Sequence, residues 1–287
     1  MQALTELLDQ LETAVRYAGE PEPDGVVFPV WFGTNRKPHA NGFSGDRHDC
    51  VTHGPVEVHV PEAHRFGETR TAFWRKLQRF DLRDDSLRVQ NIQQQEHDEF
   101  LKEIQAATAA ARASGETPHA LFFLHGFNVT FEDAAIHAAQ IGFDLKVPGA
   151  TAFFSWPSRG SVRAYPADEA TIEASEQAIT NFLVDFTQEC GAENVHVIAH
   201  SMGNRGLLRA LQRIAANAET SGKVKFGQVF LAAPDVDRDL LGHSYFAQAE
   251  ALLHDMYDLI RHGARPADRQ RLSPAVADGA SYWKLRR

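Results

Sequence analysis

The stretch VHVIAHSMGNR, residues 195–205, decides the fold of this chain. β-Branched and apolar residues lead into a turn in which Ala199 and Gly203 stand two positions before and after Ser201. Apolar residues then recur at helical spacing, at Leu207, Leu208, Leu211 and Ile214. This change of period predicts a strand, a sharp turn at Ser201 and a helix that begins at Met202.

The residues around Ser201 suit a nucleophile. In so sharp a turn the helix passes close to the strand, so the flanking positions must carry almost no side chain. Ala199 and Gly203 meet this condition, with Ala199 replacing the first glycine of the usual Gly-x-Ser-x-Gly pattern. Short matches of this kind also occur by chance, so the flanking strand and helix carry the prediction. We expect Ser201 to attack an acyl group, with the N–H of Met202 as one oxyanion donor.

Strands and helices alternate through the middle of the chain. Continuous apolar residues at 119–124 predict a parallel strand buried on both faces, and Thr130 with Asp133 forms a capping-box pattern before the next helix. The other expected elements are strands at 151–154, 195–199 and 226–232 and helices at 94–113 and 168–190. This alternation predicts an α/β fold with a mostly parallel central sheet flanked by helices.

The N-terminal third has a different pattern. Strands are expected at 26–32, 55–60 and 87–92, with a loop over 37–54, and they would form the antiparallel edge of the sheet. Two units are predicted, namely an amphipathic helix with its linker at 1–25 and the main domain at 26–287. The leucine stripe of the first helix must be covered by the same chain or by a second copy, which leaves a homo-oligomer open.

Ligands of parallel sheets bind beyond the carboxyl ends of the strands. His125, Trp156, Ser201 and Asp235 each fall just past the end of a predicted strand. This shared position predicts a site at that edge of the sheet.

The residues after the first buried strand are candidates for the oxyanion hole. Gly126 would let the backbone approach the substrate, and the N–H of Phe127 or Asn128 would act together with that of Met202. His125 is expected to shape this loop.

At this point the chain resembles the α/β-hydrolase superfamily, and within it a bacterial lipase-like family labelled a domain of unknown function. The resemblance covers about residues 26–260. It rests on FGTNR (32–36), LHGFN (124–128), FSWPS (154–158) with Tyr165 and Asp168, AHSMGNR (199–205), LAAPDVD (231–237) and LGHSYF (241–246). The resemblance implies an α/β-hydrolase fold and a serine hydrolase with Ser201 as nucleophile and His243 as general base, without implying a substrate.

One departure from that family concerns the acid of the triad. Family members carry a long stretch, with another strand and the usual acid, where this chain has only residues 238–242. The C-terminal half is therefore shortened, and Asp235 or Asp237 would have to orient the base, with Asp235 slightly preferred. His243 precedes an apolar helical stripe, so a role as an ordinary helix-cap residue is the alternative.

We therefore expect cleavage of small-molecule carboxylic esters through an acyl-enzyme. His125, Gly126, Trp156 and Tyr165 are expected at the substrate side, and the ring of Phe127 could join Trp156 and Tyr165 in an apolar acyl pocket. One alternative is a catalytically impaired α/β-hydrolase fold that acts as a binding or interaction module. Another is a thioesterase, amidase or phospholipase that uses the same site.

Composition excludes several other classes of function. A net charge of −9 over 287 residues argues against a general nucleic-acid binder. No apolar run approaches the roughly 18 residues of a membrane span, and the first residues lack the pattern of a signal peptide. Two cysteines, Cys50 and Cys190, favour a reducing compartment and hence the cytoplasm. The histidines at 39, 48, 53, 59 and 64 match no zinc spacing, and neither a metal nor an organic cofactor is expected.

Overall fold

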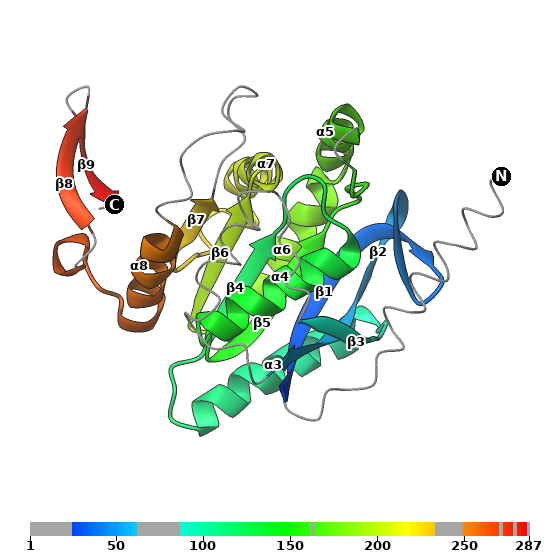
Figure 1. Ribbon diagram of the computed structural model, residues 1–287, viewed down its shortest axis with the longest axis horizontal. Helices are drawn as coiled ribbons and strands as arrows, with labels where there is room; N and C mark the ends of the chain where they lie inside the picture. The colour runs from blue at the N-terminus through cyan, green and yellow to red at the C-terminus, as the bar shows by residue number, and fades with distance from the viewer. Residues whose placement is uncertain are drawn as a thin grey trace.

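The computed structural model describes residues 25–61, 87–161, 164–232, 249–269, 272–277 and 280–285. Seven strands of these residues form one sheet in the order β3-β2-β1-β5-β4-β6-β7 (Figure 1). Strand β1 pairs with β2, and β2 with β3, in antiparallel fashion, whereas the other neighbours are parallel. The strands are β1 (Gly25–His39), β2 (Gly42–Pro61), β3 (Arg88–Ile92), β4 (His119–Leu124), β5 (Gly149–Ser155), β6 (Asn194–His200) and β7 (Val229–Ala232). The expected antiparallel edge and mostly parallel centre are confirmed.

Helices cover both faces of this sheet (Figure 1). Side chains of α3 (His97–Ala113), α6 (Glu176–Glu189) and α7 (Gly203–Ala216) pack in one apolar cluster with the strands. Those of α4 (Phe131–Asp144) and α8 (Ala249–His262) pack in the cluster on the other face. The capping box is confirmed, because Thr130 Oγ1 accepts from the Asp133 N–H and Asp133 accepts from the Thr130 N–H.

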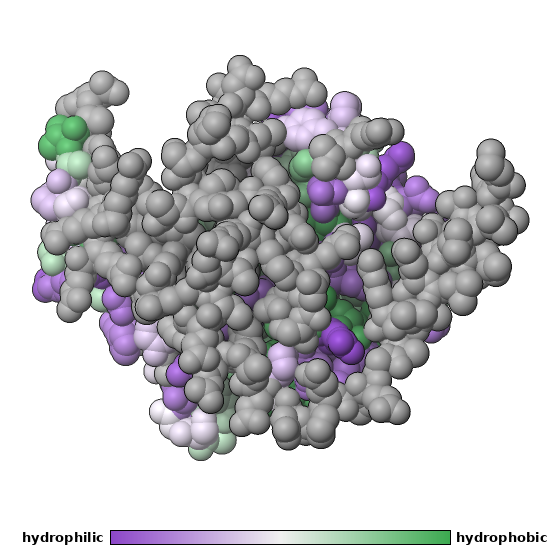
Figure 2. Space-filling view, in the orientation of Figure 1, coloured by the Kyte–Doolittle hydropathy of each residue, from purple (hydrophilic) through white to green (hydrophobic). Residues whose placement is uncertain are grey.

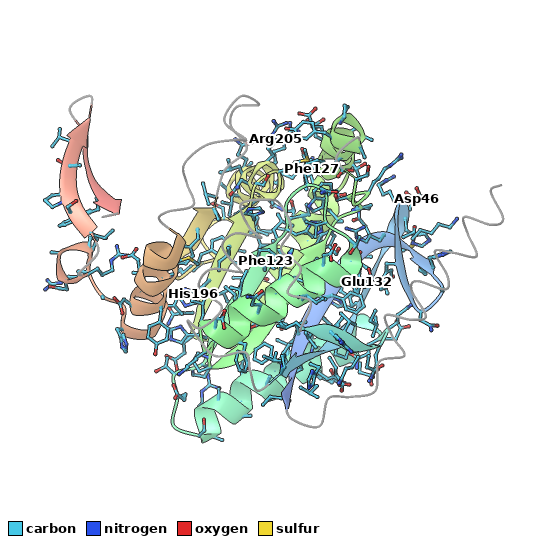
Figure 3. All side chains as sticks on the ribbon, in the orientation of Figure 1. Asp46, Phe123, Phe127, Glu132, His196 and Arg205 are labelled. Carbon is cyan, nitrogen blue, oxygen red and sulfur yellow. The ribbon has the colours of Figure 1, made fainter. Side chains whose placement is uncertain are left out.

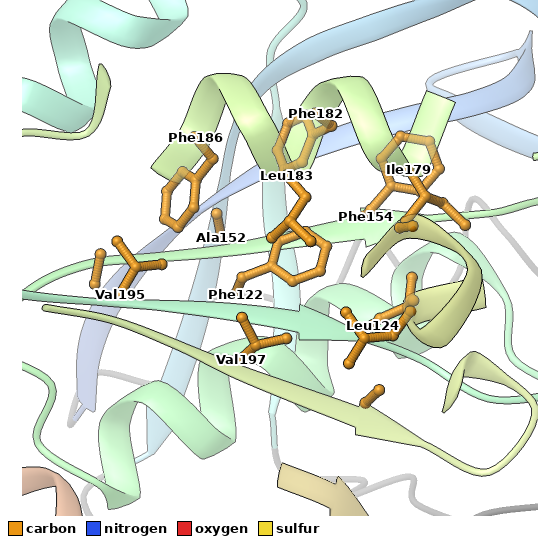
Figure 4. Close-up of a cluster of buried hydrophobic side chains, with 14 of the residues drawn as sticks. Phe122, Leu124, Ala152, Phe154, Ile179, Phe182, Leu183, Phe186, Val195 and Val197 are labelled. Carbon is orange, nitrogen blue, oxygen red and sulfur yellow. The ribbon is translucent and has the colours of Figure 1, made fainter. Parts of the chain in front are cut away.

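Strand β4 shows why a continuous apolar run is needed at the centre of the sheet. Its side chains alternate between the two clusters, with Phe122 and Leu124 on the α6 side and Leu121 and Phe123 on the α4 side. The ring of Phe122 lies 5.9 Å from that of Phe182 on α6 (Figure 4). Each fully buried side chain of this size contributes about 2 kcal/mol, so both faces stabilise the position of β4.

The prediction of a loop over 37–54 is wrong. Strand β1 continues to His39, and β2 begins at Gly42 after a tight turn in which Ala40 has a φ of 48°. Residues 37–39 and 46–50 of this hairpin are exposed and need no apolar alternation, whereas Phe43 beside the turn is buried. Main-chain pairing forms the ladder there without a pattern in the side chains.

The prediction of a single helix over 168–190 is also wrong, because two helices occupy this segment. Helix α5 (Tyr165–Ala174) ends and α6 begins around Ser175. The Ser175 hydroxyl donates to the Thr171 carbonyl oxygen (2.7 Å) and accepts from Asn35 Nδ2 (3.0 Å). A hydrogen bond from the distant strand β1 thus holds the junction between the two helices.

The C-terminal region contains elements that the sequence analysis did not predict. Strands β8 (Leu272–Ala277) and β9 (Ala280–Leu285) form a separate two-stranded sheet after a short 3-10 helix, Pro266–Asp268. Apolar surface lies at the outer end of this hairpin, to which Val276 contributes (Figure 2). None of the helices in the described ranges has the length and apolar character that a membrane crossing requires.

Candidate active site

Ser201 lies in the turn between the end of β6 and the start of α7, as predicted. Its φ is 50°, in the left-handed region that non-glycine residues rarely adopt. The Ser201 N–H donates to the Ala232 carbonyl oxygen of β7 (3.0 Å). Asn204 Nδ2 donates to the carbonyl oxygens of both Ser201 (2.8 Å) and Ala232 (3.1 Å). Strain of this kind persists only where the surroundings hold it, and it concentrates at functional sites.

Two glycines bring this turn into contact with the residues that follow β4. A Cβ on Gly203 would lie 2.5 Å from the His125 carbonyl oxygen. A Cβ on Gly126 would lie 2.8 Å from Ser201 Cβ. Both approaches are too close for a side chain, which confirms the crowding expected at Gly203 and gives Gly126 the same role.

Residues 125–130, between β4 and α4, form the segment that we call the β4–α4 loop. Its first half is held by the ring of His125, which is buried and stacks on the indole of Trp156 at 5.2 Å. Trp156 Nε1 donates to the His125 carbonyl oxygen (2.9 Å), and His125 Nδ1 lies 2.8 Å from the Gly126 carbonyl oxygen. The other ring nitrogen, Nε2, lies 3.2 Å from Ser155 Oγ at the end of β5. Burial, with the positive charge of Arg36, holds the pKa of His125 well below its usual range, so the ring is neutral.

The second half of the loop is held by Asp168 and Ser158. The Asp168 carboxylate accepts hydrogen bonds from the Ser158 hydroxyl (2.6 Å) and from the Arg159 N–H (3.1 Å). Ser158 Oγ in turn accepts from the Val129 N–H (3.2 Å). Asn128 has a φ of 61°, so this loop also contains a residue in the left-handed region. Burial raises the pKa of Asp168, and these hydrogen bonds oppose that shift.

Arg36, from strand β1, joins both halves of the loop. Its guanidinium donates to Ser155 Oγ (2.8 Å) and to the carbonyl oxygens of Val129 (2.8 Å) and Ser158 (2.8 Å). The residue is 1% exposed, and burial lowers its pKa to about 10, where it still carries its charge at neutral pH. Register shifts in the β1–β2 ladder flank Arg36 on both sides, and such bulges redirect side chains.

Two main-chain N–H groups, those of the residues that follow Gly126 and Ser201, are candidates for an oxyanion hole. Those of Phe127 and Met202 make no hydrogen bond to any residue in the described ranges. The Asn128 N–H, the alternative to that of Phe127, lies near the Asp168 carboxyl and lowers the pKa of that group. The arrangement can therefore offer two donors to a negatively charged oxygen next to a serine.

The residues expected at the substrate side separate into two groups. His125, Gly126 and Trp156 are buried and lie behind the loop surface. Phe127 and Tyr165 are half-buried, and their rings meet edge to face at 5.1 Å. Figure 3 shows Phe127 at the same end of the molecule as α7.

The predicted base and acids cannot be placed in this arrangement. His243, Asp235 and Asp237 lie outside the described residues. Within the described ranges, no group of three or more histidine, cysteine or carboxylate side chains could hold a metal ion.

Sequence reasoning assigned no role to four residues that hold the loop. They are Arg36, Ser155, Ser158 and Asp168. The signal that could have found them was positional, because the motif FSWPS spans the end of β5, and Thr34 of FGTNR pairs with Ser155 there.

Comparison with protein families places the chain in a class. Residues 101–259 match the family model described as "Alpha/beta hydrolase of unknown function (DUF900)". The match spans more than half of the chain, so the protein belongs to this family of α/β hydrolases. No curated protein and no solved structure matches the chain.

Proposed function

We propose that the protein is a serine hydrolase that cleaves carboxylic esters of small molecules through an acyl-enzyme on Ser201. The observation that carries this proposal is the strained Ser201, which abuts a loop held by buried side chains. Membership of an α/β-hydrolase family supports it, because such enzymes commonly place their nucleophile on a strand–turn–helix.

The proposed reaction uses His243 as the general base. His243 removes the Ser201 proton while Oγ attacks the ester carbonyl carbon, and the N–H groups of Phe127 and Met202 stabilise the tetrahedral oxyanion. The imidazolium then protonates the departing alkoxide, which leaves as the alcohol. Water, activated by the same histidine, hydrolyses the acyl-enzyme and restores Ser201. Asp235 or Asp237 would orient the imidazole.

The proposed acyl contact is made by Phe127 and Tyr165. The half-buried ring of Phe127, in the β4–α4 loop, meets that of Tyr165, at the start of α5. Together they give an apolar surface close to the main chain of the proposed oxyanion hole. Trp156 supports the loop from behind, since its ring is fully buried against His125.

Labelling with a fluorophosphonate, located by peptide mass spectrometry, tests this proposal. We expect modification of Ser201 in the wild-type protein, loss of labelling in Ser201→Ala and at least a hundredfold slower labelling in His243→Ala. Ser114→Ala, which removes an exposed serine at the end of α3, is the matched control and should label normally.

Absence of labelling in the folded wild-type protein would contradict the proposal and favour the binding module. If labelling occurs, turnover of p-nitrophenyl esters, a thioester, an anilide and a phospholipid then separates the esterase from a thioesterase, an amidase and a phospholipase.

A further inference from the structure

The hydrogen bonds of the His125 ring have a defined direction. The Gly126 carbonyl oxygen can only accept, so His125 Nδ1 must carry the ring proton. A neutral imidazole has one N–H, so Nε2 is an acceptor and the Ser155 hydroxyl donates to it. Ser155 Oγ in turn accepts from Arg36 Nε. One chain of donors therefore runs from Arg36 through Ser155 and His125 to the Gly126 carbonyl oxygen.

This chain determines which way the Gly126–Phe127 peptide group faces. In a planar trans peptide the carbonyl oxygen and the following N–H point in opposite directions. Because the Gly126 oxygen faces the His125 ring, the Phe127 N–H faces away from it. Gly126 itself lies against Ser201, and the Phe127 N–H makes no hydrogen bond to any residue that the structure describes. The orientation leaves this donor available beside the serine.

If Arg36 only supported the fold, burying its guanidinium would cost more free energy than burying an apolar side chain at the same position. Burial of a guanidinium is costly unless its donors are satisfied, and an apolar residue of similar volume is often as stable. The acceptors of Arg36 are Ser155 Oγ and the carbonyl oxygens of Ser44, Val129 and Ser158, with no carboxylate among those that the structure describes. Val129 belongs to the β4–α4 loop itself, and Ser158 Oγ binds the loop through the Val129 N–H.

We propose that Arg36 is a positioning residue, which orients the Phe127 N–H toward the oxyanion through Ser155 and His125 and fixes the other end of the same loop at Val129. This proposal rests on the proposed function of Ser201. Arg36 touches neither the serine nor the substrate, so its effect falls on the rate of the chemical step rather than on binding.

The test compares kcat and KM for p-nitrophenyl acetate in variants of the full chain. In Arg36→Lys a single ammonium replaces the planar fork of donors, so we expect kcat to fall by about 10- to 100-fold with KM within about twofold. Ser155→Ala removes only one hydroxyl from the chain of donors. It is the second variant, which keeps the proposal testable if Arg36→Lys does not fold. We expect it to lower kcat by about 10-fold.

The matched control is Thr108→Val, which removes a buried hydroxyl that donates to the Cys190 carbonyl oxygen (2.7 Å) at the far end of the sheet. Its kcat and KM should stay at wild-type values. Wild-type kcat in folded Ser155→Ala, or a rise in KM alone, would overturn the role of Arg36 while leaving Ser201 as the nucleophile. A wild-type protein that neither hydrolyses the ester nor labels at Ser201 would overturn the proposed function, and this proposal with it.

A second readout does not depend on activity. Long-range ¹H–¹⁵N correlation spectra should show His125 as the neutral tautomer with its proton on Nδ1, and Ser155→Ala should shift the Nε2 resonance. A proton on Nε2 would reverse the donor chain and contradict the proposal.

Discussion

His119 and His125 lie at the two ends of β4, and their surroundings differ. At the carboxyl end, both ring nitrogens of His125 are hydrogen-bonded and lead to a strained serine and a loop of main chain. At the amino end, His119 Nδ1 lies 2.8 Å from His196 Nε2, and the two rings stack. His196 Nδ1 makes no hydrogen bond to a described residue. Figure 3 shows His196 toward the other end of the sheet from Phe127.

The comparison shows which features distinguish a candidate site. Burial lowers the pKa of a histidine at both ends, well below its usual range for His125 and to about 4 for His196. A shifted pKa therefore does not separate the two. The distinguishing features of the carboxyl end are the left-handed serine and the convergence of side chains from β1, β5 and α5 on one loop.

The largest expected effect separates the two ends by activity. Ser201→Ala should lower kcat for ester hydrolysis by about 10⁴-fold or more, because the nucleophile is lost. His196→Phe keeps a ring for stacking at the amino end and should leave kcat within about twofold. Steady-state kinetics with p-nitrophenyl acetate checks both. Equal losses in the two variants would remove the distinction between the two ends.

The next effect concerns the close approach of α7 to the β4–α4 loop. In Gly203→Ala the new methyl group meets two main-chain carbonyl oxygens, those of His125 and Leu124, so the backbone must shift. We expect a loss of about 2 to 3 kcal/mol in the free energy of unfolding. Urea denaturation measures it.

Gly206→Ala is the matched control on the same helix. Its methyl group meets the flexible ends of Ile172 and Ile179, and replacing a helical glycine by alanine gains about 1 kcal/mol. Its unfolding free energy should therefore stay within about 1 kcal/mol of wild type. A loss as large as that of Gly203→Ala would contradict a specific role for the approach at Gly203.

A third effect is a pH dependence of stability. The pKa values of His53, His196 and His200 are lowered to about 4 by burial, with a smaller contribution from a neighbouring histidine in each case. Between pH 6.5 and about 4 the unfolded chain binds protons that the folded protein does not. Stability therefore rises with pH through this range and is lost as the pH falls.

Removing one of these histidines tests the assignment. His196→Phe should reduce the slope of unfolding free energy against pH by at most about 1.4 kcal/mol per pH unit between pH 6.5 and 4. The measurement is urea denaturation at several pH values. An unchanged slope would show that His196 titrates normally in the folded protein.

The sequence predicted the central strands and the turn at Ser201 because their determinants are local. Continuous apolar residues mark β4, whose two faces are both buried, and a capping box marks the start of α4. Ala199 and Gly203 mark the sharp turn, since no larger side chain fits at Gly203.

The features of the fold and of the site that the sequence did not predict depend on contacts between distant parts of the chain. The break between α5 and α6 lies at Ser175, which accepts a hydrogen bond from Asn35, 140 positions away. The burial of Arg36 depends on acceptors 119 and 93 positions away, at Ser155 and Val129. A charged residue in a strand gives no local sign that it will lie inside the protein.

The most direct test of the central claim is a crystal structure of the protein after phosphonylation by a small alkyl fluorophosphonate. We predict a covalent bond from Ser201 Oγ to phosphorus, with the phosphoryl oxygen about 2.7–3.1 Å from the main-chain nitrogens of Phe127 and Met202. A phosphoryl oxygen bonded to the Asn128 N–H, or turned away from the β4–α4 loop, would contradict the claim that this loop is held in place to stabilise an oxyanion.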